Sequence, residues 1–127
     1  MRYLLRFVVL SFLCLHGING YASGKVSSSD SLKYLSYSNS RLLSQARKAA
    51  TNDVYDEAKT MYLILLQRDS INPLYNYECG LNFFLNLFEQ PLSLPYFERT
   101  IKYSGKDTIT KAFYYLGQAY QLNNRYE

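Results

Sequence analysis

The chain has 127 residues, of which 48% are hydrophobic and 17% aromatic, with 14 Tyr, 7 Phe and no Trp. This composition suits one small packed domain and excludes a disordered chain. The formal net charge of +4 falls to +2 (12 basic against 10 acidic residues) when Arg2 and Arg6 are set aside. So small an excess, without a stripe of Lys and Arg, argues against nucleic acid as a partner.

Residues 1–22 have the three parts of a secretory signal peptide. A basic start precedes an apolar run over residues 7–15, and Gly20 and Ala22 stand at positions −3 and −1 if cleavage follows Ala22. The run is shorter than the about 20 residues of a membrane span, which disfavours an uncleaved anchor. We expect an exported protein, located in a periplasm or associated with an outer membrane.

Loss of this segment would remove Cys14 and His16, leaving Cys79 as the one cysteine and no histidine. The bulky Leu13 argues against lipid attachment at Cys14. A mature chain of this kind forms no internal disulfide, Cys/His metal site or His-based acid/base pair. We therefore expect no metal, no cofactor and no catalytic residue, and a buried, inert Cys79 thiol.

Residues 23–38 are predicted to form a linker, because their first part is rich in Ser and lacks periodicity. Residues 32–37 could instead extend the next helix backwards. Good helix formers then predict a helix over residues 41–50, with Asn39 or Ser40 as its N-cap.

A second helix is predicted over residues 54–67, with Asp53 as its cap and Pro73 beyond its end. Asp56 and Glu57 lie in its first turn, where acidic side chains interact favourably with the helix dipole. The predicted apolar stripe of this helix consists of Tyr55, Ala58, Tyr62 and Leu65, widened by Leu66.

The next predicted helix covers residues 74–88, and Pro91 ends it. Another helix follows, with Ser93 as N-cap and Gly105 as the C-terminal stop. The apolar stripe predicted for residues 74–88 consists of Leu74, Tyr77, Leu81, Phe84, Leu85 and Phe88.

The last predicted helix covers residues 109–122, before a turn at residues 123–125. Gly117 lies inside this helix, as Gly80 does in the one before, and an interior Gly costs roughly 1 kcal/mol relative to Ala. Such a glycine usually marks the close passage of another helix. The apolar stripe predicted for the last helix consists of Ile109, Ala112, Phe113, Leu116 and Tyr120.

Matching residues recur at a nearly constant spacing. Ala46 precedes Gly80 by 34 residues, and Gly80 precedes Gly117 by 37. Tyr62 precedes Phe97 by 35. A period near 34 residues with one helix–turn–helix per unit is typical of tetratricopeptide repeats.

Residues 39–127 accordingly resemble a tetratricopeptide repeat (TPR) array of about two and a half units. The third unit carries Phe113, Leu116, Gly117 and Tyr120 at the aromatic, Leu, Gly and Tyr positions of the repeat. Together with the signal peptide, the chain is also similar to the leading repeats of Bacteroidetes-type outer-membrane-protein-A-like envelope proteins. The resemblance implies an all-α fold, an α-solenoid of antiparallel helix pairs; the alternative is an unrelated bundle of four or five helices.

The implied function is a non-enzymatic scaffold or interaction module of the cell envelope, with a concave groove that holds a protein or peptide. The polar residues expected to line this groove are Arg47, Asn82, Asn86, Gln118 and Gln121. The helix that should cover Phe113, Leu116 and Tyr120 would begin near Glu127, so we expect these side chains to form an exposed patch that favours self-association or a partner. The alternatives are a fragment of a larger envelope protein and an exported enzyme or ligand-binding accessory that uses Asp56 and Glu57.

Overall fold

The computed structural model describes residues 28–124, and helices account for all of its regular structure in this range. No strand occurs between residues 28 and 124, so the all-α prediction is confirmed. The predicted signal peptide lies outside the described residues. The elements are α2 (Ser28–Leu35), α3 (Asn39–Thr51), α4 (Tyr55–Arg68), α5 (Pro73–Leu85), the 3-10 helix η1 (Gln90–Ser93), α6 (Leu94–Tyr103) and α7 (Thr110–Asn124).

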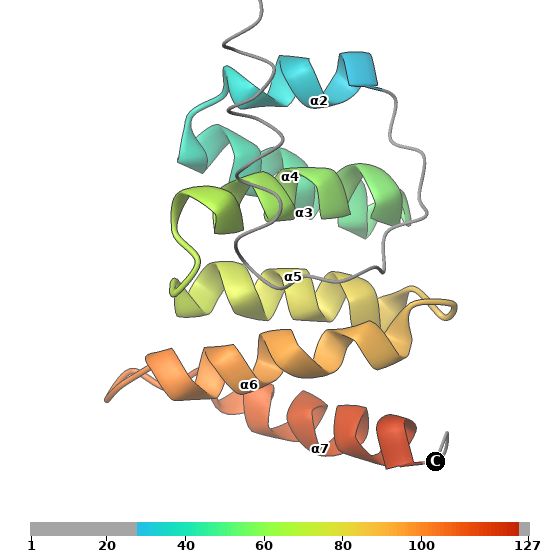
Figure 1. The fold of residues 1–127 in the computed structure, drawn as a ribbon, viewed down its shortest axis with the longest axis vertical. Coiled ribbons are helices and arrows are strands. Elements are labelled where there is room, and N and C mark those ends of the chain that lie inside the picture. Colours follow the sequence, from blue (N-terminus) through green and yellow to red (C-terminus); the bar gives the residue numbers. More distant parts are fainter. Residues whose placement is uncertain (1–27, 125–127) are drawn as a thin grey trace, which may run out of the picture.

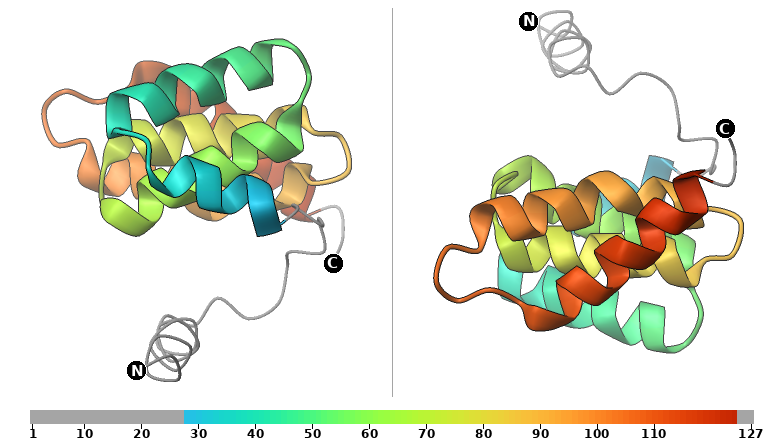
Figure 2. Two further views of the ribbon diagram at one scale, coloured as in Figure 1. Left: turned by 90° about the horizontal axis from the view of Figure 1, so that it is seen from above. Right: turned by 90° about the horizontal axis from the view of Figure 1, so that it is seen from below.

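Consecutive helices run antiparallel, with α2 at one end of the stack and α7 at the other, and α2 packs on α4 (Figure 1). Helices α3 and α4 form one pair, α5 and α6 form the next, and α4 packs on α5 between them. The predicted helix pairs are therefore present. Helix α7 packs against α6, η1 and α5, and within residues 28–124 no other helix lies on its outer side when the stack is viewed from that end (Figure 2).

The hydrophobic core lies between α3, α4 and α5. Helix α4 contributes most to it, because it is covered by α3 on one side and by α5 on the other. Burial of a large apolar side chain stabilises the fold by about 1.5–3 kcal/mol. The core side chains of these three helices are Leu42, Ala46, Ala49, Ala58, Met61, Tyr62, Ile64, Leu65, Cys79 and Phe83.

Helix α2 occupies part of the segment predicted to be a linker. Its Tyr34 is only 6% exposed and donates its hydroxyl hydrogen bond to Glu57 at the start of α4. Arg68, at the end of α4, donates to the backbone carbonyl oxygens of Leu35 and Tyr37 at 2.9 and 2.8 Å. Contacts at both ends of α4 thus hold this segment against the core, and the linker prediction fails here.

Several predicted helix caps act differently in the structure. Ser38 caps α3, one residue before the predicted candidates, and its hydroxyl oxygen accepts from the backbone N–H of Arg41 at 3.3 Å. Asp53 adopts a positive φ of 60° and accepts the Tyr55 hydroxyl at 2.8 Å instead of capping α4. Ser93 stands at the N-cap position of α6, as predicted, but its hydroxyl donates to the carbonyl oxygen of Gln90 at 2.7 Å and makes no cap hydrogen bond.

The ends of α5 and α6 follow from specific residues. Asn72 caps α5 by accepting from two backbone N–H groups, and Pro73 occupies the first helical position, where its missing N–H is not needed. Helix α5 ends at Leu85, short of the predicted residue 88, and leaves Phe88 96% exposed. Gly105 has a φ of 57° directly after the cap of α6, which confirms it as the stop.

Candidate interaction surface

A pocket lies where α7 passes the end of α5 and η1. Its volume is about 310 Å³, and it is open to solvent. The pocket brings together Gln118 and Gln121, two of the residues predicted to line a groove, with three side chains that were not predicted to line one. Its lining residues are Phe84, Gln90, Gln118, Gln121 and Leu122.

The approach of α7 to its neighbours creates this pocket. Ala112 and Ala119 are fully buried on the inner side of α7, where their small side chains let the helix lie close to the rest of the stack. Asn123, near the end of α7, donates from Nδ2 to the carbonyl oxygen of Pro91 at 3.2 Å. This hydrogen bond fixes the end of α7 to η1. Gln118 and Gln121 lie one helical turn apart on α7, and both line the pocket between α7 and η1.

Phe84, one of the lining residues, belongs to a cluster of aromatic rings. The Tyr115 ring stacks on Phe97 with centroids 5.7 Å apart, and it meets Phe84 edge-on at 5.2 Å. Phe97 is fully buried, so these contacts join α5, α6 and α7. Such aromatic pairs contribute about 0.5–1.5 kcal/mol beyond their burial, which favours a preformed pocket.

The pocket is lined by amide groups that can both donate and accept hydrogen bonds. Gln118 donates from Nε2 to the Tyr114 hydroxyl at 2.8 Å, and its Oε1 stays open. Within residues 28–124, the side-chain amides of Gln90 and Gln121 have no hydrogen-bond partner. None of the five lining side chains is ionisable, so the pocket is neutral.

Arg47 lies elsewhere and already has a partner. Its Nη2 and Nε lie 2.6 and 2.9 Å from Oε1 of Glu78, which ties α3 to α5. Glu78 also accepts the Tyr62 hydroxyl at 3.3 Å. Burial, followed by the negative charge of Glu78, raises the pKa of Tyr62. The Arg47 side chain is nevertheless 48% exposed, so it remains accessible.

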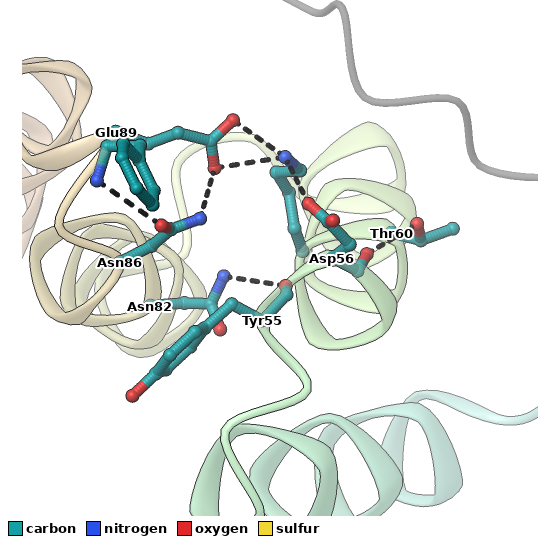
Figure 3. Close-up of polar contacts among 8 residues, drawn as sticks. Tyr55, Asp56, Thr60, Asn82, Asn86 and Glu89 are labelled. Carbon is teal, nitrogen blue, oxygen red and sulfur yellow. Dashed lines mark hydrogen bonds and ion pairs between the residues drawn. The ribbon is translucent and has the colours of Figure 1, made fainter.

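Asn82 and Asn86, two of the residues expected to line a groove, are not among the residues that line the pocket. Figure 3 shows the hydrogen bonds that their side chains make instead. Asn82 is 1% exposed and donates from Nδ2 to the carbonyl oxygen of Tyr55 at 3.1 Å, which joins α5 to the start of α4. Asn86 donates to Oε2 of Glu89 at 3.0 Å. The Asn86 amide supports the loop after α5, and the Asn82 amide supports the contact between α5 and α4. Because Asn82 is buried, its side chain is not accessible to a binding partner.

Lys59 is buried, at 7% exposure, although no sequence pattern predicted a buried lysine. Its Nζ lies 2.8 Å from Glu89 and 2.9 Å from Asp56. Burial lowers the pKa of Lys59, but hydrogen bonds to Glu89 and Asp56 outweigh this effect, and the pKa is raised. The ion pair with Glu89 anchors the residue before η1 to α4. Helix η1 begins with Gln90, which lines the pocket.

The acidic residues near the start of α4 therefore have separate structural contacts. Asp56 pairs with Lys59, Glu57 accepts from Tyr34, and Asp53 accepts from Tyr55.

Among the described residues, no three Cys, Asp or Glu side chains are placed to hold a metal ion. The described helices also include none that is long and apolar enough to cross a membrane.

The predicted exposed patch is present on α7. Phe113 is 54% exposed and Tyr120 44% exposed, while Leu116 between them is half-buried. Tyr120 donates its hydroxyl to Oε1 of Glu98 at 2.7 Å. This patch and the pocket both involve α7 but share no residue.

We compared the chain with known proteins. No family model matches its sequence, and no curated protein or solved structure gives a significant match.

Proposed function

We propose that the chain is a non-enzymatic interaction module of the cell envelope that binds a short extended peptide segment of a partner protein. The observation that carries this proposal is the neutral pocket beside α7, where the amides of Gln90, Gln118 and Gln121 lie with the apolar side chains of Phe84 and Leu122. No lining side chain offers a nucleophile, acid or base, so the pocket favours binding over catalysis.

The chemistry of the lining matches a peptide backbone. Each residue of an extended peptide offers one N–H donor and one C=O acceptor, and a glutamine amide can satisfy both. Phe84 and Leu122 supply apolar contact for a side chain of the bound segment. A volume of about 310 Å³ is at the lower end of ligand pockets, which favours a short segment over a folded domain.

Two features of the sequence support the wider setting. Spacings of 34, 35 and 37 residues between matching positions favour a TPR array, in which the groove is lined mainly by the first helices of the pairs. The basic and apolar start of the chain favours export to the periplasm or the outer membrane.

The test is a selection of random displayed peptides on the isolated chain, followed by titration of the selected peptides. The double variant Gln118→Ala/Gln121→Ala removes two hydrogen bonds worth about 1 kcal/mol each, and we expect affinity to fall about 30-fold. The control variant Gln45→Ala/Gln67→Ala removes two exposed glutamines on α3 and α4 and should leave affinity unchanged. Failure to select a peptide, or equal binding by both double variants, would contradict the proposal.

A further inference from the structure

The one charged residue of α7, Lys111, lies on the side of the helix that lines the pocket. Gln118 follows Lys111 by seven residues, nearly two full turns of an α-helix, and Leu122 follows it by eleven, about three turns. The three side chains therefore stand in one line along α7. Phe113 and Tyr120 of the exposed patch, by contrast, lie nearly opposite to Lys111 around the helix.

Aromatic rings occupy the interval between Lys111 and the pocket. The ring of Tyr115, one turn after Lys111, lies with its centroid 6.4 Å from that of Tyr77 and 5.2 Å from that of Phe84, which lines the pocket. All three rings are half-buried, so each keeps part of its surface in contact with solvent. The apolar surface of the pocket thus continues between α5 and α7 toward the start of α7.

The positive charge of Lys111 is not compensated within residues 28–124. Its side chain is exposed, and no ion pair joins it to Asp107, four residues earlier, or to any other residue in this range. The first turn of α7 contains no acidic residue, so Lys111 adds its charge to the positive end of the helix dipole. An anionic group of a ligand could therefore pair with Lys111 without first displacing an internal partner.

The surrounding charge also favours an anionic ligand at this end of α7. Residues 102–111 contain three lysines and one aspartate, a net charge of +2. The acidic residues at the start of α4 lie at the other end of the stack, because α4 and α7 run in opposite directions (Figure 1). The field of the protein should accordingly direct an acidic group toward Lys111.

We propose that the peptide held at the pocket carries an aspartate or glutamate whose side-chain carboxylate pairs with Lys111, which makes Lys111 a specificity-determining residue. This inference rests on the proposed function, since it requires a peptide in the pocket. The helical rise places Lys111 about 10 Å from Gln118 and about 16 Å from Leu122 along α7. An extended peptide spans about 3.3 Å per residue, so the acidic residue stands about three to five positions from the residue seated in the pocket.

Selection of random displayed peptides on the full chain and on its Lys111→Glu variant tests the preference. Peptides selected on the unaltered chain should contain Asp or Glu about three to five positions from an apolar residue. Those selected on Lys111→Glu should contain Lys or Arg at the same distance. The variant should keep its fold, because position 111 is exposed and a glutamate in the first turn interacts favourably with the helix dipole.

Titration of one selected peptide measures the size of the effect. Its ends are acetylated and amidated, so that side chains supply its only carboxylates. We expect Lys111→Glu to lower affinity at least about tenfold, because repulsion replaces attraction, and a peptide with lysine in place of the acidic residue to recover it. The control Lys102→Glu makes the same change of charge at an exposed position of α6 and should alter affinity less than about threefold.

Equal binding of the acidic peptide by the unaltered chain and by Lys111→Glu would overturn the inference. Equal losses in Lys111→Glu and Lys102→Glu, or no recovery with the lysine peptide, would do the same. If binding in these cases still required Gln118 and Gln121, the proposed function would stand and only the role of Lys111 would fall. Failure to select any peptide on the unaltered chain would overturn both.

Discussion

Gly80 of α5 lies against the ring of Phe97 of α6, so close that a Cβ at position 80 would fall 3.0 Å from Cε1 of the ring. Phe97 is fully buried and stacks on Tyr115 of α7 with centroids 5.7 Å apart. One glycine thus permits the close crossing of α5 and α6, and Phe97 extends the contact to α7.

Gly80→Ala should destabilise the protein. Overpacking typically costs about 1–3 kcal/mol, which exceeds the about 1 kcal/mol that alanine gains in a helix. Gly117→Ala is the matched control and should stabilise by up to about 1 kcal/mol, since no atom lies within 4 Å of its new Cβ. Urea unfolding measures both changes. A Gly80→Ala variant as stable as the Gly117→Ala variant would show that the crossing is looser than described.

Glu78→Ala should cost more stability than Arg47→Ala. Arg47→Ala removes a partly exposed ion pair, typically worth about 0–1 kcal/mol. Glu78→Ala removes the same pair and also leaves the hydroxyl of Tyr62, which is 1% exposed, without its acceptor, at a cost of about 1–3 kcal/mol. Thermal unfolding of both variants gives the comparison, and equal losses would mean that water reaches the Tyr62 hydroxyl.

Stability should fall at alkaline pH. Burial raises the pKa values of Cys79, Tyr62 and Tyr96 above their ordinary values of 9.0 for Cys and 10.0 for Tyr. The folded state therefore holds these protons more tightly than the unfolded state, so stability is complete below about pH 9 and declines as pH rises further. Urea midpoints between about pH 7 and pH 11 measure the decline. Tyr62→Phe should make it shallower, and a constant midpoint up to pH 11 would contradict these shifts.

Tyr34→Ala should destabilise the domain by about 3 kcal/mol, as truncation of a buried aromatic side chain does elsewhere. The loss would establish α2 as part of the folded unit. Leu32→Ala on the same helix is the control, because Leu32 is 68% exposed and such changes usually stay within about 0.5 kcal/mol. Equal losses of stability from the two substitutions would indicate that α2 is a linker and not part of the folded unit.

Helix positions could be predicted from the sequence, but the buried face of α5 could not. Periodicity favoured Leu74, Tyr77, Leu81, Phe84, Leu85 and Phe88, whereas the structure buries Asn76, Cys79, Gly80, Asn82 and Phe83. Apolar residues occur on all sides of this helix, so periodicity cannot choose between faces. Burial of Asn82 depends on the carbonyl oxygen of Tyr55, a long-range contact with no local signal.

The two interior glycines show the same limit. Gly80 does mark a close helix crossing, as predicted, but Gly117 faces open space. A glycine indicates that a neighbour could approach, and the fold decides whether one is there. In the candidate pocket, Gln118 and Gln121 are polar residues of a helix that was predicted from the sequence, while Gln90 was missed because only the fold brings η1 beside α7.

The most direct test of the proposed function follows the side-chain amide signals of the five glutamines by ¹H–¹⁵N NMR during titration with a selected peptide. The account predicts that the NH₂ signals of Gln90, Gln118 and Gln121 shift on binding, while those of Gln45 and Gln67, on α3 and α4, stay in place. Unchanged signals of the three pocket glutamines at saturating peptide would contradict it.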